Sequence, residues 1–155
     1  MRIAIGADHR GFNLKRQIQN FTFEQDIKWI DVGTDNEDNV DYPLYTLPVC
    51  LEVLQGSADL GILICGTGIG MSIAANRFAQ IYAALVWNEE IAKSAKEKNN
   101  ANILILPANF ITQEQAQKII NTWLKVEFIG GDYKRRINMI DAITDVNSSE
   151  ENKCC

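Results

Sequence analysis

The chain has 155 residues, a mass of 17.4 kDa and a formal net charge of −5 at pH 7. Its hydrophobic fraction of 46% and charged fraction of 23% are those of a globular domain and exclude general disorder. A nucleic-acid partner requires a basic surface excess, a membrane span requires roughly 20 apolar residues, and Asp8 comes too early for a signal peptide. We therefore expect one cytoplasmic domain that binds neither nucleic acid nor membrane.

Short β-rich segments alternate with helical patterns along the chain. Strands are predicted, in chain order, at Arg2–Ala7, Lys28–Gly33, Leu60–Ile64, Ile81–Val86 and Asn102–Leu106. Between and after them, helices are predicted at Gly11–Phe21, after Asp41-Tyr42-Pro43 with a kink or restart at Pro48, at Met71–Phe78, Asn88–Lys98 and Thr112–Val126, and from Tyr133 to Val146. This alternation predicts right-handed crossovers between parallel strands. The expected fold class is α/β, a single Rossmann-like doubly wound domain with a five-stranded, mostly parallel sheet and helices on both faces.

The C-terminal region is predicted to contain a docking helix and a tail. Ile137, Ile140 and Ile143 form one apolar stripe on the last helix, which indicates docking on the body or on a partner subunit. The polar residues 147–155 are predicted to be a disordered tail, so the domain is expected to cover residues 1–146.

Two segments that carry candidate binding or catalytic residues follow predicted strands. Asp8-His9-Arg10-Gly11 follows the first strand, and Cys65-Gly66-Thr67-Gly68-Ile69-Gly70 follows the third. If the strand order is 2-1-3-4-5, the order reverses between strands one and three, and ligands bind at such a reversal, at the carboxyl ends of the strands. The topology then places the two segments side by side.

The glycine-rich segment is expected to bind an oxyanion or a phosphate. Its glycines permit a sharp turn, and the helix that follows points its positive end into the same space. Met71 stands where a dinucleotide fingerprint needs glycine and a cysteine phosphatase loop needs arginine, and the lysine of a P-loop is absent. The usual nucleotide and phosphatase motifs therefore do not fit.

Cys65 and His9 are the candidate reactive side chains. A helix N-terminus favours the thiolate, so the pKa of Cys65 is predicted to be lowered and the thiol to act as nucleophile or general base. The alternative is an inert buried thiol, which is the prediction for Cys50. His9, the single histidine, is expected to bind phosphate or exchange protons. Asp8 either contributes to the site or caps the following helix. The cysteine spacings fit no metal site.

These motifs resemble the B-type ribose-5-phosphate isomerases, a family that includes galactose-6-phosphate isomerase subunits. The resemblance rests on Asp8-His9-x-Gly11 with Leu14-Lys15, on Asp41-Tyr42-Pro43, and above all on the continuous block from Cys65 to Arg77. It implies a homodimer, or a tetramer, with active sites between subunits. It also implies reversible aldose–ketose isomerisation of a sugar phosphate through an enediolate, with no metal or redox cofactor.

The resemblance also implies residue roles. Cys65 would be the base that moves the proton between C1 and C2, and Thr67 would help to stabilise the enediolate oxygen. The backbone N–H groups that share this task are those of Gly66, Gly68, Ile69 and Gly70. The residues that orient the sugar are Asp8, Tyr42 and Asn99. His9 and Arg136 would hold the phosphate across the dimer interface.

Three positions depart from the family pattern. Lys98 stands where a ring-opening histidine is usual, and Asn109 and Asp132 stand where phosphate-binding arginines are usual. Lys98 could protonate the ring oxygen or pair with the phosphate, and Lys134, Arg135 and Arg136 form a basic cluster that could fill the gap. The alternatives are therefore an isomerase for a six-carbon sugar phosphate, or a catalytically weak sugar-phosphate-binding subunit.

Overall fold

The computed structural model describes residues 1–150, with side chains described as far as residue 143. Its strands are β1 (Arg2–Ala7), β2 (Lys28–Asp31), β3 (Leu60–Cys65), β4 (Ala83–Leu85) and β5 (Ile103–Pro107). Its helices are α1 (Phe12–Gln19), α2 (Pro43–Leu54), α3 (Ile69–Ala75), α4 (Glu89–Asn99), α5 (Gln113–Lys125) and α6 (Asp132–Glu150). Each predicted strand and helix is present. The helix α2 continues through Pro48, so the predicted restart there is wrong.

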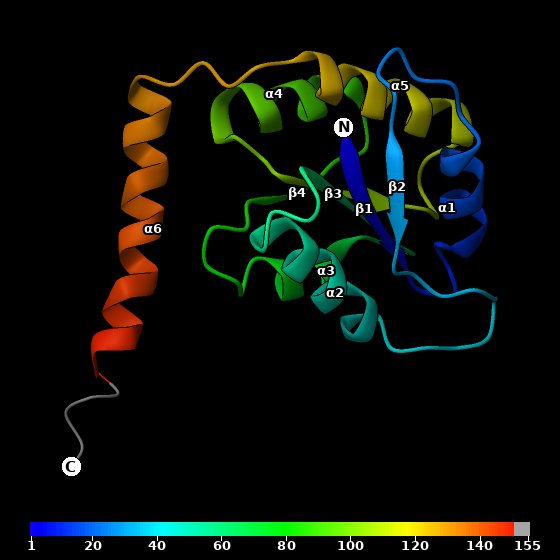
Figure 1. Cartoon of the computed structure of the whole chain (residues 1–155), viewed down its shortest axis with the longest axis horizontal. Helices are drawn as coiled ribbons and strands as arrows, with labels where there is room; N and C mark the ends of the chain where they lie inside the picture. Colours follow the sequence, from blue (N-terminus) through cyan, green and yellow to red (C-terminus); the bar gives the residue numbers. More distant parts are fainter. Residues whose placement is uncertain (151–155) are drawn as a thin grey trace.

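The five strands form one parallel sheet in the order β2-β1-β3-β5-β4 (Figure 1). The order 2-1-3-4-5 is therefore wrong for the last two strands. The five residues of β5 are all buried, whereas the three residues of β4 are half-buried, so β5 fills the interior position and β4 the edge. The reversal between β1 and β3, which defines the predicted site, is confirmed.

Helices cover both faces of the sheet, as a doubly wound fold requires. On one face α1, α4 and α5 pack against β1, β3 and β5 through a core that includes Ile18, Ile62 and Trp123. On the other face α2 and α3 pack through a second core that includes Val49, Leu63 and Met71. In Figure 1 the layer of α4 and α5 lies above the sheet and that of α2 and α3 below it. Cys50 is fully buried on α2, which confirms the structural prediction for that thiol.

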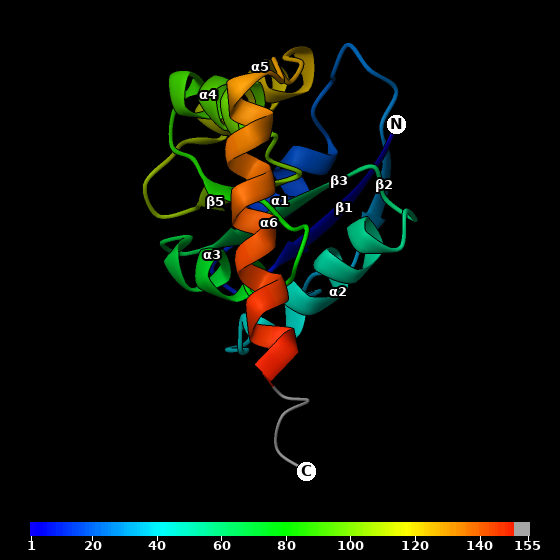
Figure 2. The same cartoon turned by 90° about the vertical axis from the view of Figure 1, so that its left-hand side faces the viewer.

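The helix α6 stands beside these layers (Figures 1 and 2). Ile137 is only 3% exposed, and the hydroxyl of Tyr82 donates to both carboxylate oxygens of Asp141 at 2.7 and 2.9 Å. Ile140 and Ile143 are 54% and 64% exposed, so only one residue of the predicted stripe docks on the body. The helix extends to Glu150, past the predicted start of the tail, and residues 151–155 lie outside the described part of the chain.

One surface of the sheet layers is unusually apolar. Leu44, Leu47 and Leu51 of α2 and Ile69 and Ile73 of α3 are all exposed, and the two helices contact each other. We call these five residues the α2–α3 apolar face. Contiguous exposed apolar residues of this kind are typical of an interaction surface.

Candidate functional site

The segments that follow β1 and β3 lie side by side, as predicted. The backbone N–H of Asp8 donates to the carbonyl oxygen of Ile64 at 3.2 Å. A Cβ at Gly11 would lie 2.4 Å from the same oxygen, so only glycine permits this approach. The site is therefore assembled at the carboxyl edge of the sheet by backbone packing.

Asp8 is 6% exposed and caps the turn into α1. Its Oδ1 accepts hydrogen bonds from the backbone N–H groups of Arg10 at 2.9 Å and Gly11 at 3.0 Å. Asp8 thus stabilises the turn before α1 and accepts no hydrogen bond from within the helix, whose N-cap is Gly11. The carboxylate also lies close enough to Cys65 for its charge to raise the pKa of that thiol.

Cys65 ends β3 and is 4% exposed. Its Sγ accepts a hydrogen bond from the backbone N–H of Gly68 at 3.1 Å. Burial raises the pKa of Cys65 above its usual range, and backbone N–H groups of Gly68, Met71 and Thr67 oppose that effect without reversing it. The predicted lowering of the pKa is therefore wrong, because the thiol faces the core of the α2–α3 layer as well as the start of α3.

The glycine-rich segment forms a tight turn into α3. Gly68 has φ +77°, and a Cβ there would lie 2.2 Å from Cδ1 of Leu85. The hydroxyl of Thr67 accepts from the N–H of Ile69 at 3.3 Å, so α3 begins at Ile69 rather than at the predicted Met71. The turn thus directs backbone N–H groups toward the thiol of Cys65, while the hydroxyl of Thr67 stays on its exposed side.

Tyr42 lies directly against this turn. A Cβ at Gly70 would lie 2.6 Å from Cζ of the Tyr42 ring, which is 38% exposed at the start of α2. The structure therefore brings a third predicted residue to the same edge, from a part of the chain that lies between the two strand-end segments.

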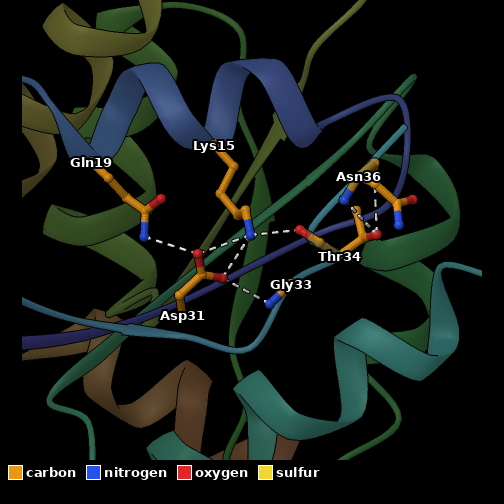
Figure 3. A network of polar contacts seen from close by, with 6 residues as sticks. All are labelled: Lys15, Gln19, Asp31, Gly33, Thr34 and Asn36. Atoms are coloured by element: carbon orange, nitrogen blue, oxygen red, sulfur yellow. Dashed lines mark hydrogen bonds and ion pairs between the residues drawn. The ribbon is translucent and has the colours of Figure 1, made fainter. Parts of the chain in front are cut away.

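His9 is held by the loop that follows β2. Its Nδ1 accepts from the backbone N–H of Val40 at 3.2 Å, which fixes Nδ1 as an acceptor and leaves Nε2 as the donor in the neutral ring. The start of that loop is fixed by the buried Lys15 (Figure 3). Its Nζ donates to the Asp31 carboxylate at 2.8 and 2.9 Å and to the carbonyl of Thr34 at 2.7 Å.

Three predicted residues do not join this group within one chain. Lys98 and Asn99 are exposed at the end of α4. Just beyond them, the carbonyl oxygen of Asn102 accepts a hydrogen bond from the backbone N–H of Gly61 at the start of β3. With roughly 3.3 Å per strand residue, Gly61 lies about 13 Å from Cys65. Arg136 is exposed near the start of α6, stacked 5.3 Å from the centroid of the Tyr133 ring. These side chains belong to the opposite end of the subunit.

A groove of about 560 Å³ lies between the body and α6, away from Cys65. Its lining combines apolar side chains such as Leu85 and Ile137 with polar ones such as Asn76, Asn99 and Asp141. It contains one predicted site residue, Asn99, and none from the carboxyl edge.

The three departures from the family pattern also have defined surroundings. Asn109 lies at the carboxyl edge, where its N–H donates to the carbonyl of Gly66 at 3.0 Å. Asp132 forms an exposed ion pair with Arg135 at 3.7 Å, which offsets part of its charge. Lys98 forms no ion pair among the described side chains.

The sequence patterns do not single out Arg10, yet its side chain borders the turn. A Cβ at Gly66 would lie 2.8 Å from Cδ of Arg10. The available signal is its position between His9 and Gly11, immediately after a strand that ends at the site.

The described residues contain no group of three or more His, Cys, Asp or Glu side chains placed to hold a metal ion. None of their helices is both long and apolar enough to cross a membrane.

Known proteins place this architecture in a family of isomerases. A sequence model of the Ribose/Galactose Isomerase family matches residues 3–140, so the chain belongs to that family. Ribose-5-phosphate isomerase B of Escherichia coli is 40% identical over 142 residues, covering 92% of this chain and 95% of the relative.

Solved structures agree with this assignment. Ribose-5-phosphate isomerase B of Clostridium thermocellum is 44% identical, with a TM-score of 0.92 over 95% of this chain and 99% of that one. The Mycoplasma genitalium enzyme, solved with bound ribulose-5-phosphate, is 37% identical, with a TM-score of 0.82 over 93% and 96% of the two chains.

Proposed function

We propose that the protein interconverts ribose 5-phosphate and ribulose 5-phosphate through an enediolate, as a step of the pentose phosphate pathway. The observation that carries the proposal is the Cys65 thiol, which lies inside a turn of backbone donors and beside Asp8 and His9. The similar Mycoplasma genitalium enzyme that binds ribulose-5-phosphate supports the choice of substrate. Phosphorylated pentoses are charged and do not cross membranes, so the proposal places the enzyme with them in the cytoplasm.

In this mechanism Cys65 is the base. Its thiolate takes the proton from C2 of the open-chain aldose and returns it to C1, while the proton on O2 passes to O1 in the enediolate stage, which gives the ketose; the direction reverses for the opposite reaction. The N–H of Gly68 stabilises the thiolate. Thr67 and the backbone N–H groups of the turn from Gly66 to Gly70 stabilise the enediolate oxygen, an effect typically worth ~3–4 kcal/mol per donor.

The remaining carboxyl-edge residues bind the substrate. Asp8 and Tyr42 border the turn and orient sugar hydroxyls. His9 directs its Nε2 donor to the phosphate, since Nδ1 is occupied by Val40. No metal or redox cofactor is needed, because the reaction moves one proton between adjacent carbons and changes no net oxidation state.

The complete site requires a second copy of the chain. Lys98, Asn99 and Arg136 cannot reach Cys65 of their own subunit, and we place them at the Cys65 site of the partner in a homodimer. The α2–α3 apolar face and the exposed Ile140 and Ile143 of α6 supply apolar surface for that interface. A closed two-fold dimer has two such sites.

A sugar-phosphate-binding subunit with weak catalysis, or an isomerase for a six-carbon sugar phosphate, is the second candidate. It is favoured by the exposed amine of Lys98, because an ammonium group is a poorer proton shuttle for ring opening near pH 7 than the histidine that is usual at this position. An open-chain substrate bypasses that step. If only open-chain analogues are turned over, ring opening is the step that Lys98 fails to support.

The test is conversion of ribose 5-phosphate to ribulose 5-phosphate by the wild type, Cys65→Ala and Cys50→Ala. Cys50 is the matched control, since it is also buried in the α2–α3 layer but lies outside the site. We expect turnover by the wild type, a loss of at least ~10²-fold in Cys65→Ala and little change in Cys50→Ala. Undiminished turnover in Cys65→Ala would remove the proposed base, and no turnover in the wild type would favour the second candidate.

A further inference from the structure

Arg10 is placed over the glycine turn by its backbone. Its N–H donates to Oδ1 of Asp8 at 2.9 Å, so the start of the side chain is fixed relative to the site. The missing Cβ of Gly66 leaves space for the stem of Arg10, whose Cδ would lie 2.8 Å from such an atom. The same missing atom would lie 3.0 Å from Nδ2 of Asn109, so the two side chains border one point of the turn.

The positive charge of Arg10 has no ion-pair partner among the side chains that the structure describes. Its side chain forms no ion pair or hydrogen bond among the described residues, and it is exposed. The neighbouring cation Lys15 is different, because Asp31 and the carbonyl of Thr34 hold its ammonium in the interior. Arg10 therefore presents an unneutralised guanidinium next to the backbone donors of the turn.

We propose that Arg10 binds the phosphate group of the substrate and selects phosphorylated over unphosphorylated sugars. The inference deepens the proposed function and rests on it. A guanidinium can donate two parallel hydrogen bonds to a phosphate, which gives both strength and orientation. The Nε2 donor of His9 and the amide of Asn109, on either side, complete the set of donors.

The positive charge of Arg10 can be supplied from a second position, residue 109. Because Arg10 and Asn109 border the same point, an arginine at position 109 can reach the space that the Arg10 guanidinium serves. Arg10→Gln removes the charge and keeps a polar side chain, and Arg10→Gln/Asn109→Arg restores the charge from the neighbouring strand end. Arg16→Gln, on the exposed side of α1, is the matched control.

Steady-state kinetics with ribose 5-phosphate and calorimetric binding of inorganic phosphate test the proposal. We expect Arg10→Gln to raise KM and the Kd of inorganic phosphate by about 10–100-fold with little change in kcat, as loss of a charged hydrogen bond predicts. The double variant should recover most of the loss, and Arg16→Gln should match the wild type. Thermal melting checks that each variant is folded.

Each outcome decides for or against the role of Arg10 in phosphate binding. Unchanged KM and phosphate Kd in folded Arg10→Gln, or no phosphate binding by the wild type, would overturn the inference. A fall in kcat at constant KM would also overturn it, because Arg10 would then act on the reacting atoms. Phosphate binding that depends on Arg10, in a wild type without turnover, would support the phosphate site while contradicting the proposed isomerase function.

Discussion

The predicted site residues pack together at one end of the sheet and are exposed at the other. At the carboxyl edge Asp8, Cys65 and Tyr42 come from separate parts of the chain. The segment of Asp8 approaches β3 through a backbone contact that only glycine permits at position 11, and the ring of Tyr42 packs against Gly70. At the other end Lys98, Asn99 and Arg136 are exposed. Under the proposed function, this difference means that one subunit supplies the reacting centre and that the exposed residues at the other end complete the site of a second copy.

The largest effect on stability and activity is expected when the close contact between Gly11 and Ile64 is disrupted. In Gly11→Ala the new Cβ meets the rigid carbonyl of Ile64, so the Asp8–His9 segment must move away from β3. We expect a loss of about 3 kcal/mol in unfolding free energy, the upper part of the usual overpacking range, and a fall in kcat/KM of more than ~10²-fold, the contribution of a positioned base. Chemical denaturation and isomerase kinetics measure both.

Gly70→Ala is the matched control. Its Cβ meets the ring of Tyr42, an exposed side chain that can turn aside. The stability change should stay below ~1 kcal/mol, with the effect appearing in KM. Equal stability of Gly11→Ala and the wild type would show that backbone contact does not hold the edge together.

A smaller loss of stability is expected when Lys15 is replaced, because its ammonium group holds the start of the loop that follows β2. Lys15→Met keeps the apolar stem but removes the donor to Asp31 and Thr34 (Figure 3). We expect a loss of about 2–3 kcal/mol, since Asp31 is partly exposed and keeps Gln19 and Gly33 as partners. Denaturation of Lys125→Met, which breaks the exposed pair with Glu24, should change stability by only about 0.5 kcal/mol. Equal losses in the two variants would contradict the role of Lys15.

The pKa of Cys65 makes the reactivity of the assembled edge depend on pH. Burial keeps this pKa above the usual range, so the thiolate fraction grows as pH rises. Alkylation of Cys65 by iodoacetamide should accelerate about tenfold per pH unit from pH 6 to pH 8 and should still be rising at pH 9. Cys50, whose pKa burial raises to about 11, is the internal reference and should react more slowly. Peptide mass spectrometry follows both sites, and a plateau at neutral pH would indicate a lowered pKa.

The smallest effect concerns the helix α6, at the end of the molecule that the proposed function assigns to a dimer contact. Tyr82→Phe removes the hydroxyl that donates to Asp141 on α6. The expected cost is about 1 kcal/mol, seen as faster amide exchange in α6 with no change in β3. Tyr133→Phe, at the start of the same helix, is the control. Unchanged exchange in α6 would mean that this hydrogen bond does not hold the helix.

Sequence patterns predict the local elements and the reacting centre better than the assembly of the subunit. Short apolar runs between helical patterns locate each strand, and the capping box at Thr112 fixes the start of α5. The order of β4 and β5 depends on long-range burial, which the lengths of the two apolar runs in the sequence do not reveal. The pKa of Cys65 was mispredicted because its burial depends on packing by α2 and α3, which position along the chain does not reveal.

Mixing two variants tests the division of the site most directly. Cys65→Ala lacks the base, and Asn99→Ala/Arg136→Ala lacks the residues assigned to the partner. Each alone should be nearly inactive. After joint unfolding and refolding at equal amounts, half of the two-fold dimers combine both chains, and each of these has one complete site, so activity should return to about one quarter of the wild type. A mixture no more active than its components would contradict a site shared between subunits.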